Sequence, residues 1–185
     1  MFQPEAKFQF VRRYCPPGEG WKVYVDIDAS EVGRTGSPRT TPEAIANQKR
    51  MESEGEQARE ALVGLGVQVG KSRADWFKKN AVPPFEGDRD IVAFHPASKV
   101  CLIAEVEGQS TGQPEQKLYK AIGQIIMATS FDRPAEWKLK FVLVVHGKEI
   151  SAHLSRAKSL RELGVSALSL AVGPEGDRWL FGAKP

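Results

Sequence analysis

The stretch DIVAFHPASKVCLIAEVE, residues 90–107, decides the fold. Two apolar runs rich in β-favouring residues flank Pro96–Lys99, a turn-forming segment, so the pattern predicts a β-hairpin with strands at 90–95 and 100–107. If Ala97 and Ser98 form the loop, the numbers of directly opposed residues sum to 195. The spacing then predicts that Asp90 lies opposite Glu105.

The same register brings several carboxylates together at the open end of the hairpin. Asp88 lies opposite Glu107, and residues two apart on a strand share a face, so all four side chains point the same way. Opposed like charges destabilise a strand pair, and a bound Mg²⁺ would remove the conflict because it prefers carboxylate oxygens. Two interpretations stay open here: a metal site, or solvated strand ends. A loop one residue longer would break the pairing.

Outward from this hairpin, the hydrophobic pattern predicts alternating helices and strands. Helices are expected at 42–65, 114–129 and 151–163, and strands at 138–146 and 165–172, with one or two more between 67 and 82. This order predicts an α/β fold with a central mixed β-sheet flanked by helices. Segments 7–14 and 21–27 flank a Pro-Pro-Gly turn and predict an N-terminal β-hairpin, followed by a loop.

Length and composition restrict the class of protein. A chain of 185 residues fits a single domain, with the N-terminal hairpin and loop at 1–41, the core at 42–173 and a C-terminal tail at 174–185. The apolar runs are too short for a membrane helix, and the N-terminus lacks the pattern of a signal peptide. Two cysteines form neither a disulfide framework nor a zinc site, which predicts a cytoplasmic protein. A net charge of +3 permits a polyanionic partner.

Three short motifs resemble the PD-(D/E)XK nuclease superfamily. They are GDRDIV at 87–92, IAEVEG at 103–108 and LYKAIGQ at 118–124. The resemblance covers roughly residues 42–172 and implies a restriction-endonuclease-like core. It also implies a Mg²⁺-dependent endonuclease, with Mn²⁺ able to substitute, which hydrolyses phosphodiester bonds of nucleic acid, DNA being favoured over RNA. A homodimer is compatible with it.

The resemblance assigns roles to individual residues. Asp90 and Glu105 correspond to the metal-binding acidic residues, and Glu107 stands where the superfamily usually has Lys. Glu107 is therefore either a general base or metal ligand, or the mark of a catalytically silent module that binds nucleic acid or a protein partner. Asp88 and Glu54 are further candidate metal ligands, and an exposed flanking residue is the competing interpretation of Glu54.

One helix predicted beside these carboxylates contributes polar candidates. Lys117, Lys120 and Gln124 share a stripe, and the resemblance places Gln124 in a motif of this helix. We therefore expect Lys117 and Gln124 to support catalysis, while a solvated helix face is the alternative interpretation. A glycosidase with paired carboxylates is a third hypothesis, which the short chain and the lack of an evident aromatic sugar platform disfavour.

Basic residues interleaved with aromatic ones predict a nucleic-acid-binding surface. Trp76 and Phe77 lie among basic residues, as in surfaces that contact a phosphate backbone. The candidate contacts are Lys71, Arg73, Lys78 and Lys79, extended by Arg34 and Arg39 in the loop before the first predicted helix of the core.

Overall fold

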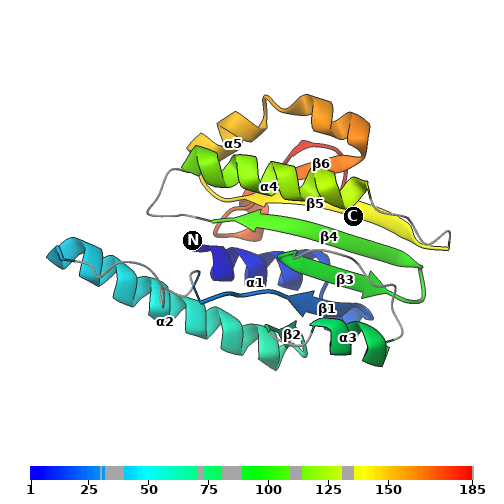
Figure 1. Cartoon of the computed structure of the whole chain (residues 1–185), viewed down its shortest axis with the longest axis horizontal. Helices are drawn as coiled ribbons and strands as arrows, with labels where there is room; N and C mark the ends of the chain where they lie inside the picture. The colour runs from blue at the N-terminus through cyan, green and yellow to red at the C-terminus, as the bar shows by residue number, and fades with distance from the viewer. Residues whose placement is uncertain are drawn as a thin grey trace.

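A single mixed β-sheet runs through the computed structural model, which describes residues 1–29, 31, 40–70, 73–80, 89–108, 114–130 and 136–184 (Figure 1). The strand order is β2-β1-β3-β4-β5-β6-β7, and only β3 and β7 run antiparallel to their neighbours among the described strands. The predicted α/β class with a central mixed sheet is confirmed. The strands are β1 (Lys22–Val25), β2 (Gln68–Val69), β3 (Ile91–His95), β4 (Val100–Glu107), β5 (Lys138–Val145), β6 (Val165–Ser169) and β7 (Arg178–Phe181).

Helices cover both faces of this sheet. They are α1 (Gln3–Tyr14), α2 (Pro42–Gly64), α3 (Arg73–Asn80), α4 (Pro114–Thr129) and α5 (Lys148–Leu154), with 3₁₀ turns at 17–19, 158–163 and 174–176. Helix α1 packs on β4 from one side and against α2, whereas α4 packs on β4 and β5 from the other. None of the helices in the described ranges is long and apolar enough to cross a membrane.

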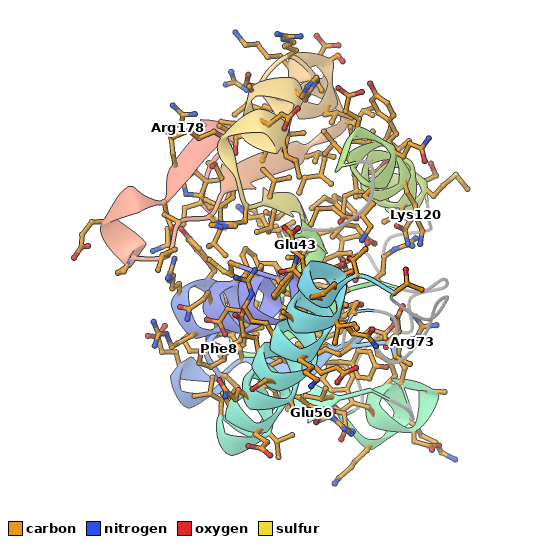
Figure 2. All side chains as sticks on the ribbon, turned by 90° about the vertical axis from the view of Figure 1, so that its left-hand side faces the viewer. Phe8, Glu43, Glu56, Arg73, Lys120 and Arg178 are labelled. Carbon is orange, nitrogen blue, oxygen red and sulfur yellow. The ribbon has the colours of Figure 1, made fainter. Side chains whose placement is uncertain are left out.

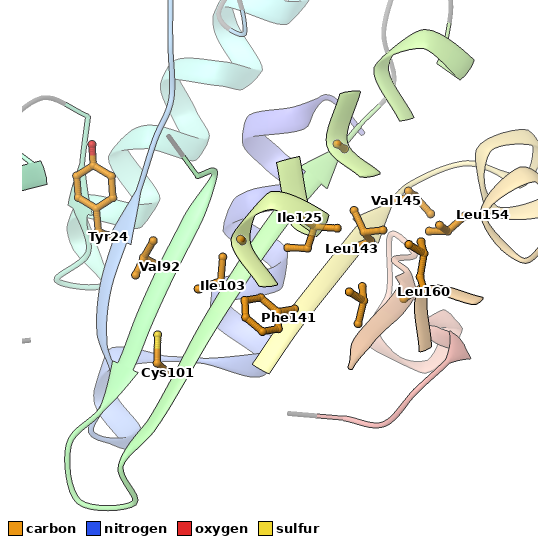
Figure 3. Close-up of a cluster of buried hydrophobic side chains, with 14 of the residues drawn as sticks. Tyr24, Val92, Cys101, Ile103, Ile125, Phe141, Leu143, Val145, Leu154 and Leu160 are labelled. Carbon is orange, nitrogen blue, oxygen red and sulfur yellow. The ribbon is translucent and has the colours of Figure 1, made fainter. Parts of the chain in front are cut away.

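The core on the α4 side is built from alternating residues of adjacent strands. Figure 3 shows Val92, Ile103 and Leu143 on one face of the sheet, with Ile125 of α4 packed over them. All four side chains are at most 1% exposed. Because side chains alternate across a strand, the next positions along β4, Glu105 and Glu107, face the same side. The core therefore ends where the carboxylates begin.

The predicted N-terminal hairpin is wrong, because its first half is helix α1. Ala6, Phe10 and Val11 are fully buried at helical spacing, and Pro4 in the first turn suits a helix start. Phe8 and Phe10 alternate with polar residues and so imitate a strand over this short window. The helix buries its face against the sheet, and this tertiary packing decides between the two patterns.

Strand β1, the second half of that predicted hairpin, lies inside the sheet rather than at its edge. It pairs with β2 on one side and β3 on the other. Helix α3 covers one face of β1, because Tyr24 is buried against Trp76 of α3 and donates a hydrogen bond to the carbonyl of Gly70. The segment before residue 42 thus supplies a central strand and a packed helix.

Two other boundaries differ from the predicted pattern. The strands expected between 67 and 82 reduce to β2 and helix α3, whose buried Trp76 and Phe77 pack on Phe94. The residues expected as a C-terminal tail include β7, which pairs with β6 at the sheet edge. Figure 1 shows this strand beside β6, at the opposite end of the sheet order from β2.

Candidate functional site

The predicted hairpin register is confirmed. Ile91 pairs with Ala104 and His95 with Val100, so opposed residue numbers sum to 195. Asp90 immediately precedes β3, and its Oδ2 accepts a hydrogen bond from the backbone N–H of Val106 at 2.7 Å. This bond fixes Asp90 beside the end of β4, where Glu105 and Glu107 lie. Asp88, its predicted companion, lies outside the described residues.

The principal partner of Asp90 is Lys7, a residue of α1 that sequence reasoning missed. The Lys7 Nζ lies 2.7 Å from Asp90 Oδ1 and 2.8 Å from each carboxylate oxygen of Glu31, and it donates to the carbonyl of Asp26 at 2.6 Å. Its side chain is fully buried. An oxygen cage from three segments of the chain therefore surrounds one ammonium group.

The charged groups in this cage shift one another's pKa values. Burial opposes ionisation of Lys7, but Asp90 and Glu31 outweigh it and raise the pKa of its ammonium group above the usual value. Burial raises the pKa of Glu31 to about 7, against the pull of Lys7. Lys7 is therefore always charged in the folded protein, while Glu31 is close to its titration point at neutral pH.

Glu105 is the most deeply buried acidic residue of the predicted site. Its side chain is 2% exposed, and Arg89 Nε lies 3.9 Å from its Oε1, beyond hydrogen-bond distance. Oε1 accepts no hydrogen bond from any described residue. Burial first, and then Asp90, raise the pKa of Glu105 to about 9. The carboxyl group is therefore mostly protonated at neutral pH in the absence of an added cation.

Glu107 is the second buried acidic residue with an unpartnered oxygen. It is 8% exposed, and its Oε2 has no hydrogen-bond partner in the described part of the chain. Burial, followed by Asp90, raises the pKa of Glu107 to about 7, although Lys117 and Lys120 act in the opposite direction. Both lysines are exposed on α4, so the structure brings the predicted Lys117 near Glu107. Figure 2 shows Lys120 on the α4 side of the sheet.

Other predicted site residues are not joined to the carboxylates. Glu54 lies on α2, is 37% exposed and has Arg50 Nε 3.6 Å from its Oε1, which agrees with the exposed flanking interpretation. Gln124 is half-buried on α4, and its side chain makes no hydrogen bond within the described ranges. Within the described ranges, neither Glu54 nor Gln124 forms a hydrogen bond or an ion pair with Asp90, Glu105 or Glu107.

The predicted basic surface is only partly described. Lys78 and Lys79 are exposed at the end of α3, and Arg73 is half-buried at its start, on the α4 side of the sheet in Figure 2. Trp76 and Phe77, the aromatic residues interleaved with them, are buried in the core, so any contact with a nucleic acid here would be made by the basic side chains. The other candidates, Lys71, Arg34 and Arg39, lie outside the described residues.

Lys7, Glu31 and Arg89 are the functional candidates that the sequence did not reveal. Arg89 stands between two acidic residues in the quoted motif and could have been suspected as their counter-charge. Lys7 offered no such signal, since it was predicted to be the first residue of a strand. Only the recognition of α1, with Pro4, Lys7 and Val11 on one buried stripe, would have placed it inward.

The described side chains supply some, but not all, of the donor groups of a metal site. No group of three or more His, Cys, Asp or Glu residues in those ranges is arranged to hold a metal ion. The donor chemistry nevertheless fits a hard cation, because Glu105 and Glu107 each carry a buried oxygen without a hydrogen-bond partner. Comparison of the chain with protein-family models, with curated proteins and with solved structures gives no match.

Proposed function

We propose that this chain is a metal-dependent nuclease that hydrolyses phosphodiester bonds, with DNA as the favoured substrate. The observation that supports it best is the pair of buried carboxylate oxygens without a hydrogen-bond partner on Glu105 and Glu107, beside Asp90. Unsatisfied buried acceptors are rare and call for an explanation, and a divalent cation supplies one. The proposal includes a restriction-endonuclease-like core. The order of the elements around the carboxylates along the chain, β1, β3, β4, α4 and β5, supports it, with α2, β2 and α3 inserted between β1 and β3.

Glu105 and Glu107, with Asp90, are the residues that would hold Mg²⁺, which Mn²⁺ could replace. Such an ion makes a bound water more acidic and neutralises charge on phosphate oxygens. The chain's own groups would do the rest. Where Glu107 does not bind the ion itself, its pKa of about 7 suits it to take up a proton near neutral pH as the general base. Lys117 and Lys120, which stabilise the ionised form of Glu107, would attract the scissile phosphate to this end of β4.

The proposal is tested by incubating the full chain with plasmid, linear duplex and single-stranded DNA in Mg²⁺, Mn²⁺ or EDTA. Cleavage should require the divalent ion, and Glu105→Gln should lower its rate by about 10²–10³-fold, the usual cost of losing one interaction with the transition state. Glu149→Gln, at an exposed position of α5, is the matched control and should cleave normally. Absence of cleavage with any DNA or RNA under all ionic conditions would refute the proposal.

The Lys7 cage favours a second candidate, a catalytically silent module of the same fold. The ammonium group already occupies a set of oxygens that includes Asp90 Oδ1. In that case neither Mg²⁺ nor Mn²⁺ should raise the melting temperature of the wild-type chain at millimolar concentration. Lys7→Met should create divalent-ion binding at the vacated oxygens, seen as a new calorimetric binding signal. Glu107→Lys, which restores the commoner motif, would show by a gain of cleavage that position 107 alone disables the site.

A further inference from the structure

We infer that two adjoining basic hollows beside α5 and β7 bind the phosphate backbone of a nucleic acid. The first hollow, of about 580 Å³, is lined by His146 and Lys148 after β5 and by Arg178 at the start of β7. The second, of about 770 Å³, is lined by Arg156, Lys158 and again Arg178. Arg178 borders both hollows, and the pair of hollows is called here the Arg178 groove.

The charges of the Arg178 groove are of one sign. Neither lining contains an Asp or Glu among the described residues. Lys148, Arg156, Lys158 and Arg178 are exposed, and none of them forms an ion pair with a carboxylate in the described ranges. Cations usually acquire such neighbours on a mixed surface, whereas several unpaired ones along a concave recess focus a positive potential. A polyanion that fits a recess is the partner with matching chemistry.

The groove begins beside the end of β4, the strand that carries Glu105 and Glu107. The backbone N–H of His146, which lines the first hollow, donates to the carbonyl of Glu107 at 3.0 Å. Figure 2 looks onto this edge of the sheet and shows Arg178 on the β7 ribbon beside α5, away from Lys120 and Arg73. A strand held at Glu107 could therefore continue past His146 into the groove, on the opposite side of the carboxylates from the predicted α3 surface.

The concave shape favours a nucleic acid over a membrane. A bilayer presents a flat surface and is usually met by exposed apolar side chains mixed with basic ones. Of the groove lining, Val172 is the one exposed large hydrophobic residue in the described part of the chain. A competing explanation of Arg178 is protection of the edge strand β7 against pairing with a strand of another molecule. That explanation predicts no affinity for polyanions.

The inference deepens the proposed function, since it assigns the path of the substrate, and binding is therefore measured without cleavage. Fluorescent single-stranded and duplex DNA are titrated in EDTA over a range of NaCl concentrations, following anisotropy. In Lys148→Gln/Arg156→Gln/Arg178→Gln the log–log salt slope should fall by about 2–3, since each lost phosphate contact removes about 0.7–0.9. Affinity near 0.1 M salt should fall on the order of 100-fold.

Two comparisons make the result specific. Lys49→Gln/Arg59→Gln/Lys138→Gln removes the same charge from exposed positions elsewhere and should change the slope little. Arg178→Lys should keep most of the affinity, because lysine retains the positive charge at the position that borders both hollows. The inference would be overturned by an equal loss of affinity in the control variant or by an unchanged salt slope in the groove variant. Binding of the wild-type chain to phosphatidylserine vesicles, but not to DNA or RNA, would also overturn it. Groove-dependent binding without any cleavage would refute the nuclease proposal alone, and cleavage with an unchanged groove variant would refute the groove alone.

Discussion

Glu105 binds more protons in the folded chain than in the unfolded one. Its pKa is raised to about 9, and that of Glu107 to about 7, from an ordinary value of 4.5. Below pH 4.5 both residues are protonated in the folded and the unfolded chain, so their titration does not change the free energy of unfolding. As pH rises, the unfolded chain releases these protons first, so folding stability falls until the folded pKa values are passed. The candidate site therefore destabilises the fold most at alkaline pH.

This linkage predicts that Glu105→Gln stabilises the protein above pH 7. A carboxyl group that keeps its proton only in the folded chain lowers the free energy of unfolding by up to about 1.4 kcal/mol per pH unit. This decrease applies between the pKa of the unfolded chain and that of the folded chain. The free energy of unfolding from urea titrations at pH 5, 7 and 9 should decline more steeply for wild type than for Glu105→Gln. Exposed Glu149→Gln serves as the control. Parallel pH profiles for the two proteins would show that Glu105 titrates as an ordinary carboxyl group.

Residue identity alone could not have predicted the cage around Lys7. The local pattern identified Asp90, Glu105 and Glu107, because they lie within one hairpin whose register depends on a short turn. Lys7 reaches Asp90 only through the packing of α1 on the sheet. Contacts between residues far apart in sequence leave no periodic signal, and one charged residue in a helix usually faces solvent.

At the scale of elements, the start of α1 lies directly against the end of β4. A Cβ atom at Gly108, the residue after β4, would lie 2.6 Å from the backbone carbonyl carbon of Phe2 and would overlap the backbone of Gln3. Backbone cannot move aside as a side-chain tip can, so only glycine fits here. The predicted motif IAEVEG therefore ends in a residue required by packing of the helix and not by a turn.

Gly108→Ala should push α1 away from β4 and destabilise the fold by about 1–3 kcal/mol, as over-packing does. Differential scanning calorimetry gives the change in melting temperature. The matched control is Gly64→Ala at the end of α2, where an added Cβ meets nothing within 4 Å. There the substitution should be neutral or slightly stabilising, since Ala is the better helix former. If both variants melt alike, the close approach of α1 to β4 is not present in solution.

At the scale of the whole molecule, the sheet depends on both ends of the chain. The sequence predicted the class of fold because helices and strands from 90 onward alternate with clear periodicity. It assigned the first 41 residues to an appendage because two phenylalanines at alternate positions imitate a strand. A pattern over eight residues cannot distinguish a strand from a helix, and burial of this segment against β4 favours the helix.

Removing residues 1–20 should therefore prevent folding rather than trim an appendage. The deletion uncovers Leu102, Ala104 and Val106, all fully buried on the α1 side of β4. We expect loss of soluble monomer in size-exclusion chromatography and no cooperative urea transition. Arg12→Ala, at an exposed position of α1, should behave as wild type. Cooperative unfolding of the shortened chain at the wild-type midpoint would contradict this dependence.

The contact between α1 and the β3–β4 hairpin also has a consequence for synthesis of the chain. Gln3 and Asp90 are 87 residues apart, so α1 can pack against α2 earlier but meets the start of that hairpin only after 87 further residues have been synthesised. At roughly 5–20 residues per second, the wait is about 4–17 s. Until then, the face of α1 that carries Phe10 and Val11 lacks its partner strand and is available to chaperones. Helix α1 therefore completes its packing on the sheet only after β4 has been synthesised.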